Sequence, residues 1–406
     1  MKILFVTTAS STAYAFLLDL AHYLRSQGFN VEFACSNMNY SDAKSRVHEL
    51  EVDGFTVHNI PFSRPISPIK DLISLFNLCA LLRDNNYDIL HVHTSKASWI
   101  GRIAGRLSRV PLIVYTAHDF YFRSFKGGYK RNFYIILEKI ASPFSDVTLF
   151  VSEAVKTEAI KEHIFKSDNL VWVGNGIRCD KFEINATYRN TMSLKYGISS
   201  HAPIIGVVAR LVKNKGIDLF IKAASVISNI YPNAKFIICG YGPEEENLRT
   251  LTKELNISDK VIFTGRIESK EELNHIMASF SIFLFPTRRE GLGIVYLEAM
   301  VLGIPVVGTR IPPVTEIIID GQTGLLADTE DYNAFALSAI SLLTDHDLSK
   351  RLVDAAQKRV WEYFNLPIIN QRTKSAYYSA IMTTKSAKKL VKYIDLTYID
   401  KCTKIL

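Results

Sequence analysis

Two glutamates flank a glycine-rich turn in the second half of the chain. They begin and end the segment EGLGIVYLE at residues 290–298, in which a helix is predicted to begin near Gly293. A turn of this kind exposes backbone N–H groups at the positive end of a helix, where anions bind. Glu290 and Glu298 add carboxylates, which accept hydrogen bonds from vicinal hydroxyls and bring no competing donor. The segment predicts a site for a ligand that carries both an anion and hydroxyl groups.

Two cations upstream could reach the same anion. Arg210 and Lys215 follow a predicted strand in the segment ARLVKNK at residues 209–215. With the turn and the two glutamates they suit a nucleotide-sugar, which combines a diphosphate, a ribose and a hexose. Cleavage of a glycosyl diphosphate builds negative charge on the leaving phosphate, and fixed cations stabilise that charge in the transition state. Because the cations do the work that a metal ion does elsewhere, no metal site is expected.

A second group of candidate residues follows strands in the first half of the chain. His118 ends a predicted strand, and Asp119 either hydrogen-bonds its imidazole or caps the following segment. His91 and His93 are expected to alternate across a strand end, which disfavours a metal ion shared between them. Lys96 follows closely. Ligands of open parallel sheets bind beyond the carboxyl ends of the strands, so both groups are expected to line one interdomain cleft.

Taken in order along the chain, these motifs resemble the retaining glycosyltransferases of family 4, which have the GT-B fold. The first half adds HVHTSK at residues 91–96, then Gly101 and Arg102, then VYTAHD at residues 114–119. That combination is similar to a bacterial subgroup that builds polysaccharide repeat units or oligosaccharides on polyprenyl-diphosphate carriers. The resemblance covers about residues 1 to 380.

The resemblance implies a role for each candidate residue. Arg210 and Lys215 clamp the donor diphosphate, and His118 lies near the reacting sugar. Glu290 meets the donor sugar or supports its loop. The other implied contacts are Glu298, Gly291, Leu292, Gly293, Gly242 and Arg266 on the nucleotide side, and His93, Lys96 and Asp119 on the acceptor side. No cofactor is implied, and retention would proceed with the leaving phosphate taking the acceptor proton.

Strands and helices are predicted to alternate through both halves, which indicates parallel sheets built from βαβ units. The predicted strands are Lys2–Thr7, Val31–Ala34, Ile89–Val92, Leu112–Thr116, Thr148–Val151 and Leu170–Val173, then Ile204–Ala209, Phe236–Cys239, Val261–Phe263, Ile282–Phe285 and Pro305–Val307. The fold class is therefore α/β, and the GT-B resemblance implies two Rossmann-like domains. We expect an acceptor domain at 1–180 with returning helices at about 366–382, a donor domain at 200–365 and a basic tail at 383–406.

Composition and charge limit the remaining possibilities. The chain has 406 residues, 48% of them hydrophobic, and five scattered cysteines without a C-x-x-C pair, which indicates reduced thiols in the cytosol. Neither a signal peptide nor an apolar run of about 18 residues is expected. The net charge of +8 gathers at 96–139 and 383–406. With interleaved aromatic residues, the first cluster fits docking on an anionic membrane, and the alternative is a solvated basic face. No nucleic-acid motif accompanies it.

The sequence thus predicts a hexosyltransferase on the inner face of the plasma membrane. The donor would be a nucleotide-sugar, UDP-linked, and the acceptor a polyprenyl-diphosphate-linked saccharide or a surface-polysaccharide intermediate. Two other classes stay open: a nucleotide-sugar 2-epimerase on the same fold, and a non-catalytic partner in a polysaccharide assembly complex.

Overall fold

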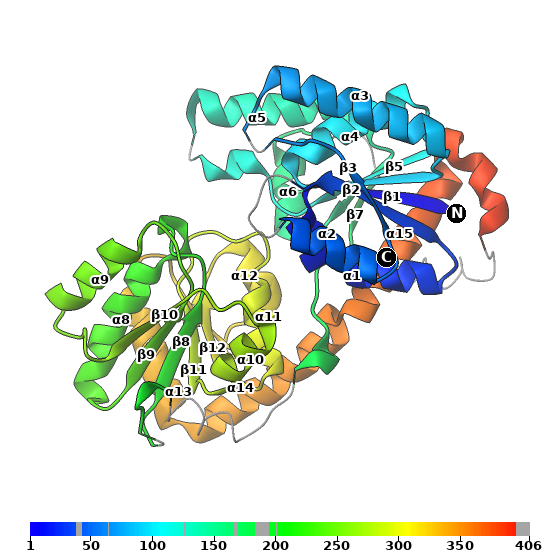
Figure 1. Ribbon diagram of the computed structural model, residues 1–406. Helices are drawn as coiled ribbons and strands as arrows, with labels where there is room; N and C mark the ends of the chain where they lie inside the picture. Colours follow the sequence, from blue (N-terminus) through cyan, green and yellow to red (C-terminus); the bar gives the residue numbers. More distant parts are fainter. Residues whose placement is uncertain are drawn as a thin grey trace. The chain divides into compact units, whose positions relative to one another are not determined.

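Two parallel β-sheets organise the chain in this computed structural model (Figure 1). The structure describes residues 1–37, 43–63, 65–125, 127–165, 169–182, 195–199 and 201–394. The chain divides into one unit of Met1–Gly174 with Pro367–Leu406 and a second unit of Asn175–Leu366.

The sheet of the first unit has seven strands in the order β3-β2-β1-β4-β5-β6-β7, all paired in parallel. The strands are β1 Lys2–Ala9, β2 Asn30–Ser36, β3 Thr56–Asn59, β4 Ile89–His93, β5 Leu112–Ala117, β6 Val147–Phe150 and β7 Leu170–Trp172. The helices are α1 Ser10–Ser26, α2 Ala43–Val52, α3 Pro68–Asn85, α4 Ser95–Leu107, α5 Gly128–Ala141 and α6 Glu153–Lys161. Successive side chains of a strand face opposite sides, so Ile3 and Phe5 enter one core while Leu4 and Val6 enter another.

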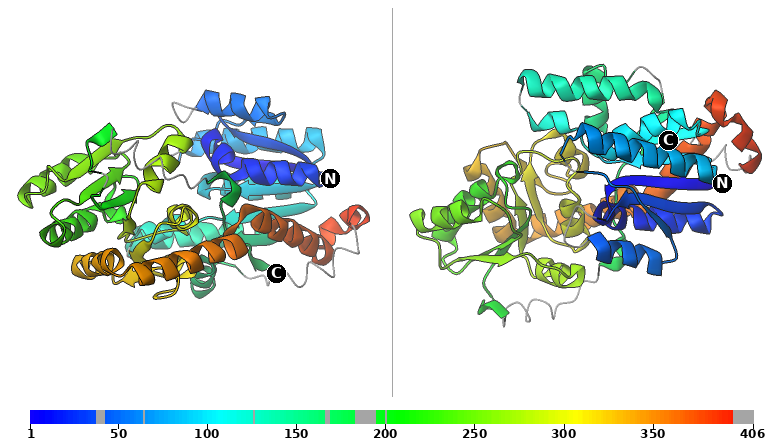
Figure 2. Two further views of the ribbon diagram at one scale, coloured as in Figure 1. Left: turned by 90° about the horizontal axis from the view of Figure 1, so that it is seen from below. Right: turned by 45° about the horizontal axis from the view of Figure 1, so that its top comes forward.

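The chain returns to this unit after the second one. Helix α15 (Leu366–Thr383) buries Tyr377 and Ile381 in the core that also holds residues of α1. Its ribbon is drawn in dark orange to red in Figure 2. The following 3-10 segment η6 (Lys385–Tyr393) buries Leu390, and Ile394 packs in the same core. The described part of the predicted basic tail is therefore a packed element, and residues 395–406 lie outside the described residues.

The second unit has a six-stranded parallel sheet in the order β10-β9-β8-β11-β12-β13. Its strands are β8 Ile204–Val208, β9 Lys235–Cys239, β10 Val261–Gly265, β11 Ile282–Phe285, β12 Val306–Thr309 and β13 Leu325–Ala327. Its helices are α8 Ile217–Ile230, α9 Glu245–Glu254, α10 Lys270–Ala278, α11 Ile294–Val301, α12 Pro312–Ile317, α13 Tyr332–Thr344 and α14 His346–Arg359. The predicted strands of both units are confirmed to within a few residues, whereas β3 and β13 were not predicted.

Each sheet changes direction at one place. The strand order runs outward from β1 in the first unit and from β8 in the second, so the switch points lie between β1 and β4 and between β8 and β11. Crevices for ligands form at the carboxyl ends of such strands. Among the described residues, no helix is long and apolar enough to cross a membrane.

Candidate active site

The loops that leave β8 and β11 bring two candidate residues into contact. Lys215 ends the 3-10 turn η4 (Lys213–Lys215), and its Nζ lies 2.5 Å from Glu290 Oε1. Both side chains are largely buried, with 22% and 11% of their areas exposed. The structure therefore joins a cation and a carboxylate 75 residues apart at the switch point of the second sheet.

Backbone contacts explain why Lys215 is held at this position. Gly216 has a φ of 66°, and a Cβ on it would lie 1.9 Å from the carbonyl oxygen of Pro286. Glycine is needed there for both its left-handed conformation and the close approach. Nearby, the backbone N–H of Arg288 donates to Asn214 O at 2.9 Å, and Arg288 Nη1 donates to Lys213 O at the same distance.

Arg288 is a residue that the sequence did not single out. Its guanidinium donates to both oxygens of Asp218 at 2.6 and 2.7 Å and to both oxygens of Glu330 at 2.5 and 2.8 Å. Burial alone would raise the pKa of Asp218, but the hydrogen bonds and charge of Arg288 outweigh it and lower that pKa. The partners lie 70 and 42 residues away, so spacing along the chain gave no signal for this cluster.

The glycine-rich turn leads directly into α11, as predicted. Gly293 precedes the helix with a φ of 94°, and a Cβ on it would lie 2.9 Å from the ring of the buried Tyr296. Tyr296 donates to the carbonyl oxygen of Phe285 at 2.5 Å, which ties the helix to the end of β11. Gly291 is partly exposed, while the Leu292 side chain packs in the core and is not available to a ligand. The turn thus presents backbone groups at a helix N-terminus beside Glu290.

Glu298 is paired with Lys270, which the sequence did not indicate as a site residue. Its Oε1 accepts from Nζ of Lys270, the first residue of α10, and only 12% of the Glu298 side chain is exposed. Ser269 caps α10 through Glu272 N, so the sequence around Lys270 indicates only a helix start. A ribose that binds Glu298 must share or displace this ammonium.

Three further candidates lie at neighbouring strand ends. Arg210 is exposed just after β8. A Cβ on Gly242 would lie 2.3 Å from Leu211 O, so Gly242 supports the loop that carries Arg210. Arg266 lies with its guanidinium 5.4 Å from the ring centroid of Tyr241, which is half exposed, and 3.0 Å from Glu268.

In the first unit, three histidines gather at the carboxyl ends of β4 and β5. The rings of His91 and His93 lie 4.0 Å apart, and His93 Nδ1 lies 3.2 Å from His118 Nε2. The expectation that His91 and His93 face opposite sides is wrong, because residues two apart on a strand share a face. His91 Nδ1 contacts Tyr377 of α15 and its Nε2 contacts Thr116, both at 2.6 Å.

Burial decides the charge of these histidines. It lowers the pKa of His118 to about 4 and holds those of His91 and His93 well below 6.5, with the neighbouring imidazoles acting in the same direction on the latter two. All three are therefore neutral at pH 7. His93 Nε2 is buried with no hydrogen-bond partner among the described residues.

The other acceptor-side candidates are engaged with protein groups. Asp119 accepts from the backbone of Phe120 at 2.9 Å and from Arg123 at 2.6 Å, so it is bonded to the following segment, although the 3-10 turn η1 (Tyr121–Ser124) has no side-chain cap. Lys96 donates to Asp71 at 2.7 Å, to Ser63 at 3.2 Å and to the carbonyl oxygen of Pro65. Three bonds use every donor of its ammonium, so Lys96 holds the segment before α3 in place.

A metal site is not evident in the described part of the chain, where no group of three or more His, Cys, Asp or Glu side chains is placed to hold an ion. An Asp-x-Asp sequence occurs at Asp345 and Asp347, and there Asp345 caps α14 by accepting from Leu348 N at 2.8 Å.

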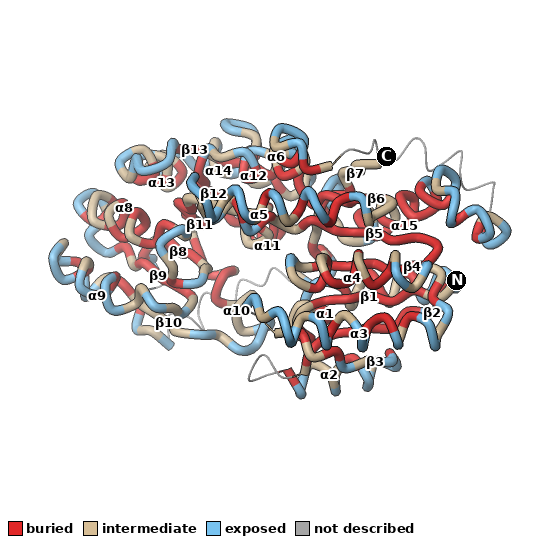
Figure 3. The backbone as a smooth tube through the Cα atoms, turned by 90° about the horizontal axis from the view of Figure 1, so that it is seen from above, coloured by how far each residue is buried: buried red, intermediate tan, exposed pale blue. Residues whose placement is uncertain are grey.

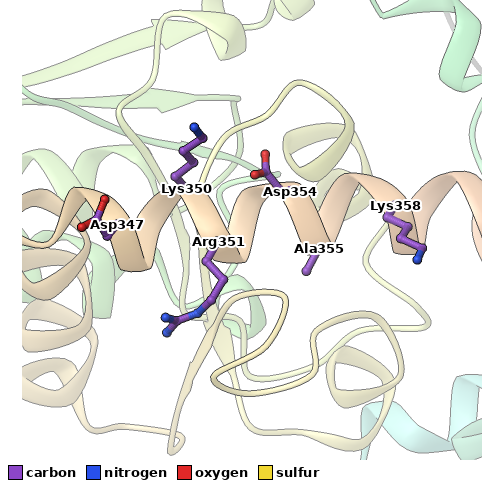
Figure 4. Close-up of a pocket in the computed structure, with 6 residues that line it drawn as sticks. All are labelled: Asp347, Lys350, Arg351, Asp354, Ala355 and Lys358. Carbon is purple, nitrogen blue, oxygen red and sulfur yellow. The ribbon is translucent and has the colours of Figure 1, made fainter.

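A surface hollow beside this helix is shown in Figure 4. It is lined by Asp347, Lys350, Arg351, Asp354, Ala355 and Lys358. Lys350 and Asp354 point to one side of α14 and Arg351 to the other, so these groups do not converge on a ligand.

The basic segment 96–139 is less basic at its surface than its composition indicated. Several of its arginines are paired with carboxylates inside the unit: Arg102 with Glu138, Arg106 with Asp146, Arg123 with Asp119 and Glu158, and Arg131 with Glu162. Two of its aromatic residues, Phe120 and Phe122, are buried in the core. Charge alone therefore does not make this segment a membrane surface.

Comparisons with known proteins agree over most of the chain. Residues 15–181 match the model of Glycosyltransferase Family 4, and residues 189–359 match that of Glycosyl transferases group 1. The Staphylococcus aureus capsular polysaccharide biosynthesis glycosyltransferase CapM is 29% identical over an alignment of 352 residues, and the match covers 84% of this chain and 90% of the relative. The Escherichia coli UDP-Gal:alpha-D-GlcNAc-diphosphoundecaprenol alpha-1,3-galactosyltransferase is 26% identical over 79% of this chain and 82% of its own.

Solved structures confirm the GT-B fold. Anabaena Alr3699/HepE, in complex with UDP and glucose, superposes with a TM-score of 0.79 at 20% identity and covers 93% of this chain and 100% of its own. WaaG, a glycosyltransferase involved in lipopolysaccharide biosynthesis, gives a TM-score of 0.70 at 16% identity over 94% and 100% of the two chains.

Proposed function

Because the chain belongs to glycosyltransferase family 4, we propose that it transfers a hexose-type sugar from a UDP-sugar, with retention, to a polyprenyl-diphosphate-linked saccharide or surface-polysaccharide intermediate. The observation that carries the proposal is the Lys215–Glu290 pair beside the N-terminus of α11, at the switch point of the second sheet. A cation and a row of backbone N–H groups recognise a diphosphate, and a carboxylate recognises sugar hydroxyls.

Two relatives support the choice of donor and acceptor class. The name of the E. coli relative includes both a UDP-sugar and a diphosphoundecaprenol acceptor, and the Anabaena structure holds UDP and glucose. The S. aureus relative acts in capsular polysaccharide biosynthesis. A lipid-linked acceptor also implies work at a membrane surface, and we place that surface on the inner face of the plasma membrane.

Each residue then has a chemical task. As the glycosyl bond breaks, Lys215 and Arg210 stabilise the charge on the departing diphosphate more than they stabilise the bound donor. Glu298 accepts from the ribose hydroxyls, Glu290 orients Lys215 and meets the donor sugar, and the backbone of Gly291 to Gly293 contacts the phosphate. Gly242 shapes the nucleotide site, and Arg266 contacts the base.

The first unit supplies the acceptor side. His118 is neutral at pH 7 and offers a hydrogen bond to the reacting sugar without adding charge, and His93 contacts the acceptor. Lys96 and Asp119, which are bonded to protein groups, act on the acceptor side by holding the loops around it in place. In the step itself the acceptor oxygen bonds to the anomeric carbon on the face that the phosphate leaves. The acceptor proton passes to the departing phosphate oxygen, so no protein nucleophile is required.

The test is nucleotide release by the purified protein with no added metal and with EDTA. UDP-, GDP- and ADP-hexoses are each incubated with and without a short-chain polyprenyl-diphosphate N-acetylglucosamine. The proposal expects UDP release that depends on the acceptor, together with a lengthened glycan. A 2-epimerase would isomerise the nucleotide-sugar without acceptor, and a non-catalytic partner would release nothing; either result overturns the proposal.

A further inference from the structure

Two helices of the first unit turn apolar stripes toward solvent. On α3 the stripe consists of Ile69, Leu72, Ile73 and Phe76, and on α5 of Tyr129, Phe133, Ile136 and Ile140. We call these eight residues the α3–α5 face. They are 47% to 80% exposed, and they are eight of the twenty-one exposed large hydrophobic side chains in the described chain. Scattered apolar residues are normal on a surface, but such a concentration marks an interaction site.

The spacing shows that each stripe is continuous. The residues follow one another at intervals of three, one and three on α3, and four, three and four on α5. At about 100° per residue, each set lies within one narrow side of its helix. The opposite side of each helix holds the core residues, among them Leu78 and Leu82 of α3 and Ile135 of α5. Both helices are therefore apolar on two sides, and the described part of the fold covers only one.

The two stripes face the same way. Helix α4 lies between α3 and α5 on one side of the sheet, and all three contribute to the same core (Figures 1 and 3). Ser108 Oγ, just after α4, donates to Cys79 O of α3 at 3.3 Å, and Trp99 Nε1 of α4 donates to Leu137 O of α5 at 2.9 Å. These bonds fix the helices as one layer, so the stripes form one outer surface.

The charges around this surface are almost all positive. The exposed charged residues of α3 and α5, both helices being fully described, are Lys70, Arg83, Lys130 and Lys139 against one acid, Asp84. By helical spacing Lys130 and Lys139 fall on either side of the α5 stripe. Two copies of the chain meeting here would bring like charges together, whereas anionic lipid head groups would neutralise them.

We propose that the α3–α5 face is the surface by which this protein docks on an anionic bilayer. The apolar stripes enter the interface, where aromatic side chains such as Tyr129 are favoured, and the four cations meet the head groups. The inference rests on the proposed function in one respect, because a lipid-linked acceptor brings the enzyme to a bilayer. Helix α3, outside the segment whose composition indicated membrane contact, supplies half of the surface.

Co-sedimentation with vesicles tests the proposal. The wild type is mixed with phosphatidylcholine vesicles that contain or lack phosphatidylglycerol. The double variants Ile73→Ser with Phe76→Ser and Phe133→Ser with Ile136→Ser should each weaken binding about tenfold or more. Lys70→Glu with Lys130→Glu should weaken binding by about fivefold per charge, and only on the anionic vesicles. Val52→Ser with Ile160→Ser, at exposed apolar positions on α2 and α6, should bind as the wild type does.

Two readouts separate this proposal from the proposed function and from its rival. All variants should keep the UDP-induced thermal shift of the wild type, which also shows that they fold. A wild type that binds vesicles but releases no UDP contradicts the proposed function and leaves the docking result intact. The proposal is overturned if the stripe variants bind vesicles as well as the wild type. It is also overturned if the wild type binds no vesicles but forms a dimer without lipid in sedimentation velocity, and the stripe substitutions dissociate that dimer.

Discussion

Lys215 Nζ lies 2.5 Å from Glu290 Oε1, so the proposed phosphate-binding cation is already oriented by the carboxylate proposed to meet the donor sugar. The pair is largely buried between the loops that follow β8 and β11. A diphosphate that binds here would share the Lys215 ammonium with Glu290, because the lysine side chain is already held in place. Preorganised charge of this kind costs no rearrangement during the reaction, which is the condition under which it accelerates a step most.

Lys215→Ala should therefore lower kcat/KM for the UDP-sugar by roughly 10²–10³-fold, with most of the loss in kcat. The measurement is UDP release at saturating acceptor. Lys213→Ala is the matched control, because Lys213 belongs to the same turn, is exposed, and contributes its backbone oxygen to Arg288. Equal losses in the two variants would show that general positive charge, and not the Lys215 position, carries the effect.

Substitution of Glu298 and substitution of Lys270 should change the affinity for the nucleotide in opposite directions. Glu298→Ala removes the proposed ribose acceptor and should weaken UDP binding by about 10- to 100-fold. Lys270→Ala removes a competitor for the same carboxylate and should strengthen UDP binding by up to about fivefold, since an ion pair whose lysine is half exposed is worth about 1 kcal/mol. Calorimetric titration with UDP measures both. Weaker binding by Lys270→Ala would mean that this lysine itself contacts the nucleotide; the exposed Glu271→Ala serves as the control.

The sequence predicted the architecture because most strands are buried apolar runs. All residues of β4, β5 and β11 are buried, and such runs between helical patterns indicate parallel strands. Strand β3 has a single apolar residue, Val57, and the apolar run of β13 is only three residues long, so neither was detected. The site loops could be predicted because each of them directly follows one of these detected strands.

What the sequence could not predict are pairings across long separations. Arg288 with Asp218 and Lys270 with Glu298 join charged residues whose local surroundings are ordinary helix starts and loops. The outer stripe of α3 was missed for a different reason. Its periodicity is the same as that of a buried helix face, and only the fold shows which of its two apolar sides is covered.

Gly216 should tolerate no side chain. With a φ of 66° and Pro286 O in the place of a Cβ, Gly216→Ala combines a strained backbone with a direct clash. We expect a loss of more than ~2 kcal/mol of unfolding free energy, and weaker UDP binding because Lys215 moves. Gly321 has a φ of 69° but nothing within 4 Å of a Cβ, so Gly321→Ala should cost only about 1 kcal/mol and leave UDP binding unchanged. Urea unfolding and titration with UDP compare the two, and equal losses would contradict the packing argument.

His118 makes stability depend on acidity. Burial lowers its pKa to about 4 from 6.5, so between these values the unfolded chain binds more protons than the folded chain. The free energy of unfolding should therefore fall as the pH drops from about 6.5 to about 4, and this group has no further effect above that window. His91 and His93, whose pKa values are lowered in the same direction, should add to the loss.

His118→Asn should remove one part of that dependence. Between pH 7 and pH 4, the free energy of unfolding should fall by up to ~3 kcal/mol less in the variant than in the wild type. Urea midpoints measured at several pH values report the difference, and His48→Asn, at an exposed position of α2, should follow the wild-type curve. If the His118 variant and the wild type lose stability in parallel, His118 is protonated as readily in the folded chain as in the unfolded one. Burial would then not lower the pKa of His118, and its imidazole would be partly protonated at pH 7.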